Sequence, residues 1–361
     1  MNRLRVAVVG VGALGRHHAR ILSELDGVEL VAVADSQAER GQEVANKHQT
    51  RWVADYRELA DPSLIDAVSV VVPTIAHRTV ASPFLQQGIP VLVEKPLAAN
   101  VTEAKELVTS ASRNQTLLQV GHIERFNPAF QTARDRIVNP KYIRCERTST
   151  YTFRSTDIGV VLDLMIHDID LVLSLVNSPV RSCEAFGIGL MGQNEDAAQA
   201  RLHFENGCIA DITASRISPV ASRSMTAWSA AGCVTVDLHQ RDVKCFAPGN
   251  ALKFGTSPLE RAAKPGADLE ALKKQVFGHF IEIDELKVDA SGSDALTQEL
   301  SEFVHCVRTG QTPHVTGKQA CEAIVVADQV LKQIASHQWD GHAHGGIGPY
   351  PMSTIPLRKV A

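Results

Sequence analysis

Two apolar segments of the chain carry polar groups that could stabilise a charged oxygen or move a proton. Lys95 ends an apolar, strand-like run that begins at Val91, and Pro96 stops the segment directly after it. A lysine after a strand is usually a solvated surface residue, but here the strand is predicted to be buried and the proline fixes the turn. An ammonium group held at this point could polarise a hydroxyl or carbonyl oxygen.

Asp163 and His167 are spaced i, i+4 in the apolar run 160–173, so we expect both to project from one face of a helix. A single histidine in such a helix is usually a core residue. A carboxylate one turn away can orient the imidazole and stabilise its charged form, which predicts a base with a pKa near neutrality. Asp168 and Asp170 lie on other faces, where we expect them to bind backbone or a neighbouring element. A zinc site of Asp163, His167 and Asp170 is disfavoured, because Asp170 is displaced by most of a turn and no further ligand is suggested.

A glycine-rich segment follows the first strand-like run and opens a helical pattern. It consists of Gly10, Val11, Gly12, Ala13, Leu14 and Gly15. The three glycines allow a tight turn, close approach of the backbone to a pyrophosphate, and close packing of helix on strand. Asp35 ends the next strand-like run, at about the spacing where a carboxylate hydrogen-bonds the adenosine ribose of a dinucleotide. The segment therefore predicts a dinucleotide site.

Asp35 also bears on which dinucleotide binds. A carboxylate at this position repels the 2′-phosphate of NADP, so the sequence favours NAD over NADP. The neighbours Ser36 and Gln37 add no positive charge, although Arg40 could supply one.

Pro73, Thr74 and His77 follow another strand-like run and would lie at the same ligand-binding edge of a sheet. The alternative is a strand terminator with a capping threonine, and for His77 both interpretations stay open.

The elements that position these groups alternate strand and helix over residues 1–125. Strand-like runs, rich in valine as in a sheet buried on both faces, lie at 4–10, 28–34, 67–72, 90–94 and 117–121. Helical patterns lie at 13–25, 37–48, 77–88 and 101–113. This is the pattern of an α/β, doubly wound Rossmann domain with a parallel sheet, in which ligands bind at the carboxyl ends of the strands.

Residues 126–336 predict an α+β domain with an open, mainly antiparallel sheet. One apolar helix is expected near 159–176, and the runs 200–204 and 208–212 form a hairpin around Glu205-Asn206-Gly207. Two late helices, near 293–308 and 317–335, are expected to flank one of the domains. The proline-broken stretch 249–276 is predicted to be a long loop with a short helix, and 337–361 an extended tail, in which His342 and His344 are more simply solvated than metal-bound.

Composition excludes several classes of protein. The net charge is −4 at pH 7, so no basic field exists to hold a nucleic acid. The seven cysteines show no Cys-x-x-Cys spacing and are interpreted as reduced, buried thiols. No signal peptide and no apolar run of membrane-spanning length is found, so we expect a cytoplasmic protein with no membrane partner.

These motifs together resemble the oxidoreductase family named after glucose-fructose oxidoreductase, inositol dehydrogenase and the MocA proteins. The resemblance covers about residues 4–335 and rests on the glycine segment, Pro73-Thr74 with His77, Glu94-Lys95-Pro96, and Asp163 with His167. It implies that Lys95, Asp163 and His167 form the catalytic set beside the nicotinamide, and that Glu94 and Lys95 join Pro73, Thr74 and His77 in the cofactor site. The mechanism expected is hydride transfer from a sugar carbinol to NAD, with His167 as proton acceptor and Lys95 stabilising the oxygen.

A finer resemblance, to the branch that oxidises nucleotide-sugars such as UDP-N-acetylglucosamine at C3, rests on the segment 120–128 and the segment 163–170. It implies that His122, Arg125, Asn127 and Arg154 contact the substrate. The alternatives are helix capping by Asn127 and surface solvation of the two arginines. A polyol or free-sugar dehydrogenase and a non-enzymatic NAD sensor remain as other functions. An open sheet face also predicts a homo-oligomer, a dimer or a tetramer.

Overall fold

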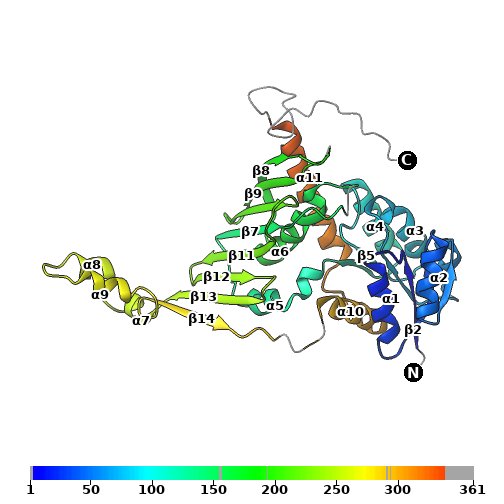
Figure 1. Ribbon diagram of the computed structural model, residues 1–361, viewed down its shortest axis with the longest axis horizontal. Helices are drawn as coiled ribbons and strands as arrows, with labels where there is room; N and C mark the ends of the chain where they lie inside the picture. The colour runs from blue at the N-terminus through cyan, green and yellow to red at the C-terminus, as the bar shows by residue number, and fades with distance from the viewer. Residues whose placement is uncertain (1–2, 154–156, 193, 290–291, 293, 338–361) are drawn as a thin grey trace.

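The computed structural model describes residues 3–153, 157–192, 194–289, 292 and 294–337. Its elements build two sheets that lie side by side (Figure 1). Both predicted layers of the fold are confirmed: an N-terminal parallel sheet and a C-terminal, mainly antiparallel one. Of the predicted extended tail, only His337 is described.

The first sheet has six parallel strands in the order β3-β2-β1-β4-β5-β6. They are β1 (Leu4–Val9), β2 (Val28–Ala34), β3 (Arg51–Val53), β4 (Ala67–Val70), β5 (Val91–Glu94) and β6 (Leu118–Gly121). Five of them were predicted within a few residues. The sixth, β3, was missed because three residues at the edge of a sheet leave no hydrophobic period to detect.

Helices cover both faces of this sheet, as a doubly wound fold requires. They are α1 (Gly15–Glu24), α2 (Ala38–Lys47), α3 (His77–Gln86) and α4 (Val101–Arg113), with short 3₁₀ turns η1 (Tyr56–Leu59) and η2 (Thr74–Ala76) between strands and helices. Alternate residues of β1 enter different cores: Val6 and Val8 pack with α1, whereas Ala7 and Val9 pack on the opposite side. This explains why most residues of these strands are apolar and do not alternate with polar ones.

The second sheet has eight strands in the order β14-β13-β12-β11-β7-β10-β9-β8, and only the pair β7 and β10 is parallel. The strands are β7 (Tyr142–Thr148), β8 (Val180–Ile188), β9 (Ala197–Phe204), β10 (Ile209–Ser215), β11 (Ser222–Ser229), β12 (Gly232–Asp237), β13 (Asp242–Pro248) and β14 (Ile281–Leu286). The predicted hairpin is confirmed as β9 and β10.

One face of the second sheet is covered by helices. Its helical elements are η3 (Ile123–Phe126), α5 (Pro128–Arg134), η4 (Val161–Met165), α6 (Ile166–Val176) and the late helix α11 (Gly317–Ser336). The other late helix, α10 (Ala295–Thr309), packs instead on the first sheet, where Leu300 and Phe303 join the core formed with α1. The late helices therefore flank both sheets, and α10 returns the chain to the dinucleotide domain.

The stretch 249–276 was predicted to be a loop with one short helix, and this was wrong. It forms three short helices, α7 (Asn250–Lys253), α8 (Pro258–Ala262) and α9 (Leu269–Lys274). Ser257 and Asp268 cap the second and third of these helices through their side-chain oxygens, which the proline-rich composition hides. Together with the ends of β13 and β14 these helices form an arm that stands out from the body (Figure 1). No helix in the described ranges is long and apolar enough to cross a membrane.

Candidate active site

The glycine segment between β1 and α1 has the backbone form that a pyrophosphate-binding turn needs. Gly10 has a φ of +85°, and a Cβ there would collide with the Val71 carbonyl oxygen. A Cβ on Gly15 would collide with the carbonyl oxygen of Gly10. At Gly12 a Cβ would meet nothing within 4 Å, so the backbone there faces open space. The segment therefore leaves room for a ligand to approach the backbone closely, as predicted.

A cavity of about 490 Å³ opens beside this turn at the carboxyl ends of β1, β2 and β4. Its wall includes Gly10, Gly12, Asp35, Arg40 and Pro73. Ala13 and Leu14 lie exposed at the start of α1. The position and lining of the cavity suit the adenosine half of NAD, with the pyrophosphate on the glycine turn.

Asp35 lies at this cavity, but its carboxylate already accepts four hydrogen bonds. Arg40 donates through Nε at 2.9 Å and through Nη2 at 2.7 Å, and the backbone N–H groups of Val11 and Gln37 donate at 3.0 and 2.9 Å. Burial raises the pKa of Asp35, but these donors outweigh it and hold the pKa below its usual value. A ribose hydroxyl of the cofactor would therefore hydrogen-bond to the Asp35 carboxylate, whose negative charge Arg40 partly neutralises.

His77 and Thr74 are more enclosed than the sequence suggested. Thr74 lies in η2 with 7% of its surface exposed, and His77 is 1% exposed. His77 Nδ1 lies 2.8 Å from the Pro96 carbonyl oxygen and Nε2 lies 2.9 Å from that of Val72. Burial lowers the pKa of His77, and a neutral imidazole has one N–H to donate, so the ring hydrogen-bonds one of these carbonyl oxygens and packs against the other. His77 thus joins the end of β4 to the Lys95-Pro96 turn. We therefore no longer expect it to contact the cofactor.

Lys95 extends from the end of β5 to η4, the helical turn that precedes α6. Its Nζ donates to the Asp163 backbone oxygen at 2.6 Å and to Asp163 Oδ1 at 3.3 Å. Both side chains are 19% exposed. The lysine is thus held by a partner 68 residues away in the chain, and it keeps access to the pocket between the two sheets.

His167 lines the same pocket, but Asp163 does not orient it. Its Nδ1 is buried and has no hydrogen-bond partner within the described part of the chain, and the carboxylate of Asp163 contacts Lys95 instead. Burial, followed by the positive charges of Lys95 and Arg147, holds the pKa of His167 well below its usual value. The prediction of a pKa near neutrality was wrong, and His167 is a neutral imidazole at physiological pH.

The local winding of the helix explains the lost pairing. Asp163 lies in η4, a π-helical turn from Val161 to Met165, whereas His167 lies in the regular helix α6. In a π turn, residues about five apart lie on the same face, whereas in an α-helix residues four apart do. The expectation that Asp163 and His167 project from one face therefore fails at this junction. The turn is anchored by Glu195, whose side chain accepts from the Val161 N–H at 3.0 Å.

The pocket that contains Lys95 and His167 has a volume of about 360 Å³ and joins both sheets. Glu94, Leu14 and Gly121 line it from the first domain. From the second domain come residues that the sequence did not single out, namely Arg147, Thr148, Ser149, Leu164 and Arg223. In the sequence, only the alternation of polar residues along β7 pointed to any of these pocket residues, such as Thr148. Such alternation is common on any half-exposed strand, so it does not identify a site.

Arg147 carries a buried ion-pair network beneath this pocket. It is 3% exposed and donates to Asp168 at 2.8 and 2.9 Å and to Glu124 Oε1 at 2.7 Å. Burial lowers the pKa of Arg147, but the two carboxylates outweigh it and raise the pKa above its usual value. The prediction that Asp168 binds a neighbouring element is confirmed, and this pairing anchors α6 to β7.

The residues expected to contact the substrate are occupied elsewhere. Arg125 forms a bidentate pair with Asp170 at 2.6 and 3.0 Å, and His122 Nδ1 lies 3.9 Å from the same carboxylate. Asn127 caps α5 through the Ala129 N–H and donates to Glu124 Oε2 at 2.9 Å. Arg125 and Asn127 are therefore corrected to structural roles, because their polar atoms already have internal partners. His122 is buried, with 1% of its surface exposed, and its Nδ1 has no hydrogen-bond partner among the described residues. The fourth, Arg154, lies outside the described residues.

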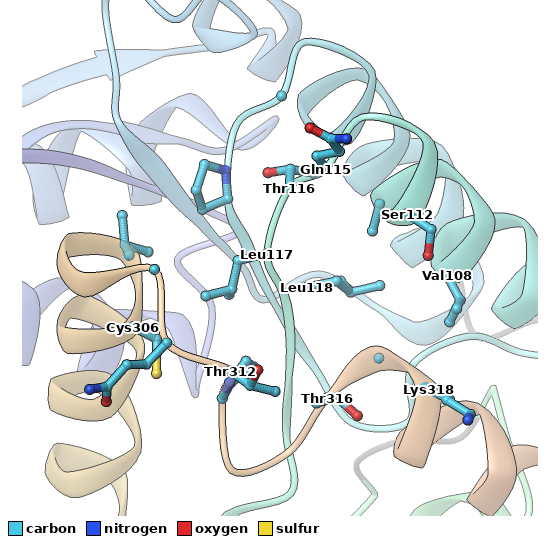
Figure 2. Close-up of a pocket in the computed structure, with 18 residues that line it drawn as sticks. Val108, Ser112, Gln115, Thr116, Leu117, Leu118, Cys306, Thr312, Thr316 and Lys318 are labelled. Atoms are coloured by element: carbon cyan, nitrogen blue, oxygen red, sulfur yellow. The ribbon is translucent and has the colours of Figure 1, made fainter.

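A third cavity, of about 500 Å³, lies at the amino ends of β5 and β6 (Figure 2). Leu117, Leu118 and Thr316 are among its lining residues. Its titratable lining consists of Lys318 and Cys306, and burial raises the pKa of the Cys306 thiol to about 11. A protonated thiol and one lysine do not form a catalytic set, so the acid-base groups gather at the opposite edge of the sheet.

A dinucleotide cavity next to a pocket that holds a lysine and a neutral imidazole is the arrangement of a nicotinamide-dependent dehydrogenase acting on a CH–OH group. No group of three His, Cys, Asp or Glu side chains able to hold a metal ion is found among the residues described.

Comparison with known proteins identifies the family. Residues 4–122 match the model of the GFO/IDH/MocA oxidoreductase family with its NAD-binding Rossmann fold, and residues 119–234 match the GFO/IDH/MocA C-terminal domain. The chain belongs to the Gfo/Idh/MocA family of oxidoreductases, and its Rossmann domain binds NAD.

Two curated relatives and one solved structure are similar over most of the chain. The UDP-N-acetylglucosamine 3-dehydrogenase of Acidithiobacillus ferrooxidans is 32% identical and the alignment covers 91% of this chain and 97% of that protein. Its crystal structure superposes with a TM-score of 0.79, at 28% identity, over 92% of this chain and 98% of that one. The scyllo-inositol 2-dehydrogenase (NAD(+)) of Bacillus subtilis is 28% identical, with 87% of this chain and 89% of that protein covered.

Proposed function

We propose that this protein is an NAD-dependent dehydrogenase of a nucleotide-sugar, with UDP-N-acetylglucosamine oxidised at C3 as the first substrate to test. The observation that carries the proposal is the end-to-end similarity, at 32% identity, to a UDP-N-acetylglucosamine 3-dehydrogenase. Residues 1–125 serve as the cofactor domain in this proposal, and residues 126–336 as the substrate and oligomerisation domain.

The side chains in the pocket support separate roles for the cofactor, the histidine and the lysine. The glycine turn and Asp35 would hold NAD, which would supply the hydride acceptor for the carbinol carbon. His167 lines the pocket and its lowered pKa favours the neutral imidazole, so it can accept the hydroxyl proton. Lys95, held by Asp163, supplies a positive charge and N–H donors to the oxygen as negative charge develops on it. Asp163 thus acts on the lysine, and not on the histidine as the sequence suggested.

A substrate panel tests the proposal directly. Purified protein with NAD is given UDP-N-acetylglucosamine, other UDP-sugars, free aldoses and inositols, and NADH formation is followed by absorbance. We expect NADH with UDP-N-acetylglucosamine and a product oxidised at C3, identified by mass spectrometry and NMR. Protein with His167→Ala serves as the control for background reduction. Absence of turnover with every UDP-sugar, alongside turnover of another compound, would overturn the nucleotide-sugar assignment.

A polyol dehydrogenase is the second candidate, and the full-length similarity to a scyllo-inositol 2-dehydrogenase favours it. The same panel separates the two, because an inositol dehydrogenase reduces NAD with scyllo-inositol or another inositol and leaves the UDP-sugars untouched.

We also propose that the protein is a homo-oligomer, a dimer or a tetramer. The arm exposes large apolar side chains, including Phe254 at 85%, Leu259 at 82% and Phe277 at 62%. Apolar groups exposed to this extent on a projecting segment are typical of a surface that another subunit covers. Light scattering should give a mass of two or four chains, and Phe254→Asp with Leu259→Asp should lower it. A monomeric wild-type protein would refute the proposal.

A further inference from the structure

Three neighbouring strands of the first sheet place a polar side chain on the same buried face. These are Ser69 on β4, Glu94 on β5 and Gln119 on β6, with 0, 7 and 0% of their surfaces exposed. Their neighbours along the strands point to the other core, so all three face the layer formed by α1 and α10. This layer is otherwise apolar and contains Ala67 and Leu92.

The two covering helices each add a polar group to the same layer. His18 comes from α1 and Glu299 from α10, and both are fully buried. Gln119 Nε2 donates to the Glu299 backbone oxygen at 3.3 Å, so β6 and α10 are joined here. Ser69, Glu94, Gln119, His18 and Glu299 are called the buried polar cluster below.

The contacts within the cluster lead to the lysine in the pocket. His18 Nδ1 lies 2.9 Å from Ser69 Oγ. His18 Nε2 lies 3.1 Å from Glu94 Oε1, a close polar contact whose angle lies outside the range of a hydrogen bond. The second oxygen of Glu94 accepts the backbone N–H of Lys95 at 3.2 Å. Glu94 therefore has one oxygen on the histidine from α1 and the other on the residue that enters the pocket.

The two carboxyl groups of the cluster differ in charge. Burial raises the pKa of Glu94, but His18 and Lys95 outweigh it and hold the pKa below its usual value, so Glu94 is an anion. Glu299 has no hydrogen-bond partner for either carboxylate oxygen in the residues that the structure describes, and burial together with the negative charge of Glu94 raises its pKa well above its usual value. Apolar side chains would fill such a layer at lower cost than buried ions. The cluster therefore needs an explanation beyond packing.

We propose that His18 is a positioning residue for the dehydrogenase reaction. It holds the Glu94 carboxylate, which in turn fixes the backbone of Lys95, so that the ammonium group meets the reacting oxygen in one orientation. Glu299 is neutral and leaves Glu94 as the single anion of the cluster. The inference deepens the proposed function and rests on it for the activity measured, but its structural part can be tested without any substrate.

Two substitutions at one position separate the two contacts of the histidine. In His18→Gln the side-chain amide nitrogen takes roughly the place of Nε2 and keeps the contact to Glu94. In His18→Asn the amide takes roughly the place of Nδ1 and keeps only the contact to Ser69. Hydrogen exchange over residues 92–98, followed by mass spectrometry without substrate, reports how firmly the Lys95 segment is held.

The proposal predicts different results for the two variants. His18→Gln should keep the exchange protection and a kcat within about threefold of wild type, whereas His18→Asn should lose the protection and about 100-fold in kcat, as for a reacting group displaced by about 1 Å. NAD affinity, measured by fluorescence titration, should change little in either. Equal protection and equal kcat in the two variants would overturn the positioning role.

Glu94→Gln is a second variant that tests the same contact if the protein with His18→Asn does not fold. This variant keeps the shape of the side chain and removes its charge, and we expect faster exchange over residues 92–98 and a lower kcat with His18 intact. Wild-type protection in Glu94→Gln would refute the inference. The variant could lose protection while the wild-type protein reduces NAD with none of the compounds in the panel. This result would support the structural part of the inference and would count against the proposed function alone.

Discussion

Glu299→Gln should make the protein more stable, and the gain should grow with pH. Glu299 is fully buried on α10, and burial together with the anion of Glu94 raises its pKa well above the usual value. The folded protein therefore keeps a proton on this carboxyl group at pH values where the unfolded chain has already released it. Glutamine has the same shape and binds no proton, so the substitution isolates the cost of this titration.

The sign and size follow from linkage. Above the unfolded-state pKa of about 4.3, the folded state binds one more proton than the unfolded state, so the free energy of unfolding of the wild type falls as pH rises. The fall is about 1.4 kcal/mol for each pH unit and ends at the raised pKa of the folded state. The variant lacks this loss, so the free energies of unfolding of the two proteins should diverge by about 1.4 kcal/mol for each pH unit inside the window.

Urea unfolding, followed by tryptophan fluorescence at several values between about pH 5 and 8, measures the difference. Glu322→Gln is the matched control, because it makes the same substitution at an exposed position of another helix, α11. The difference between the two variants should increase steadily with pH. A difference that stays constant over the range would show that Glu299 is ionised in the folded protein, and would refute the charge assignment of the buried polar cluster.

Three further substitutions test the site. Lys95→Ala should lower turnover and leave NAD affinity nearly intact in a fluorescence titration; unchanged turnover would defeat the role given to the lysine. Asp35→Ser should release Arg40 to meet a 2′-phosphate and improve kcat/KM for NADP relative to NAD by about tenfold or more, and an unchanged ratio would show that Asp35 does not select the cofactor. Arg147→Met should cost about 3 to 5 kcal/mol in urea unfolding, because it leaves the buried Asp168 without its partner and takes the nearest cation from Glu124; a loss below about 1 kcal/mol would mean that the network is more solvated than its burial indicates.

The sequence was sufficient where a local rule determines the structure. The glycine segment has the positive φ at Gly10 and the open backbone at Gly12 that its spacing predicts. The continuous apolar strands are buried on both faces, as their composition indicates. These features depend on backbone sterics and on the period of the hydrophobic pattern. Both are determined by residues that are close together in the sequence.

The sequence was insufficient where the outcome depended on which partner a polar group meets. The i, i+4 spacing brings Asp163 and His167 together only in a regular α-helix, but Asp163 lies in a π turn. Arg125 and Asn127 have residue types that suit sugar recognition, but their partners come from α6 and from the connection after β12. Ser69 was read as part of an apolar strand, since one small polar residue does not disturb such a pattern. Only the structure shows that Ser69 contacts His18 of α1.

The corrected pairings share one consequence for the chemistry. Each carboxylate near His167 has a basic partner elsewhere: Asp163 has Lys95, Asp168 has Arg147, and Asp170 has Arg125. The imidazole is therefore the one group of this set left without an anion, and burial together with the nearby cations holds its pKa low. In the proposed mechanism, a carboxylate partner would raise the pKa of the histidine and slow the release of the accepted proton, whereas an unpaired His167 would release that proton more readily. The ion pairs that hold α6 in place thus leave the imidazole of His167 without a carboxylate partner, which in the proposed mechanism is the form that accepts the substrate proton.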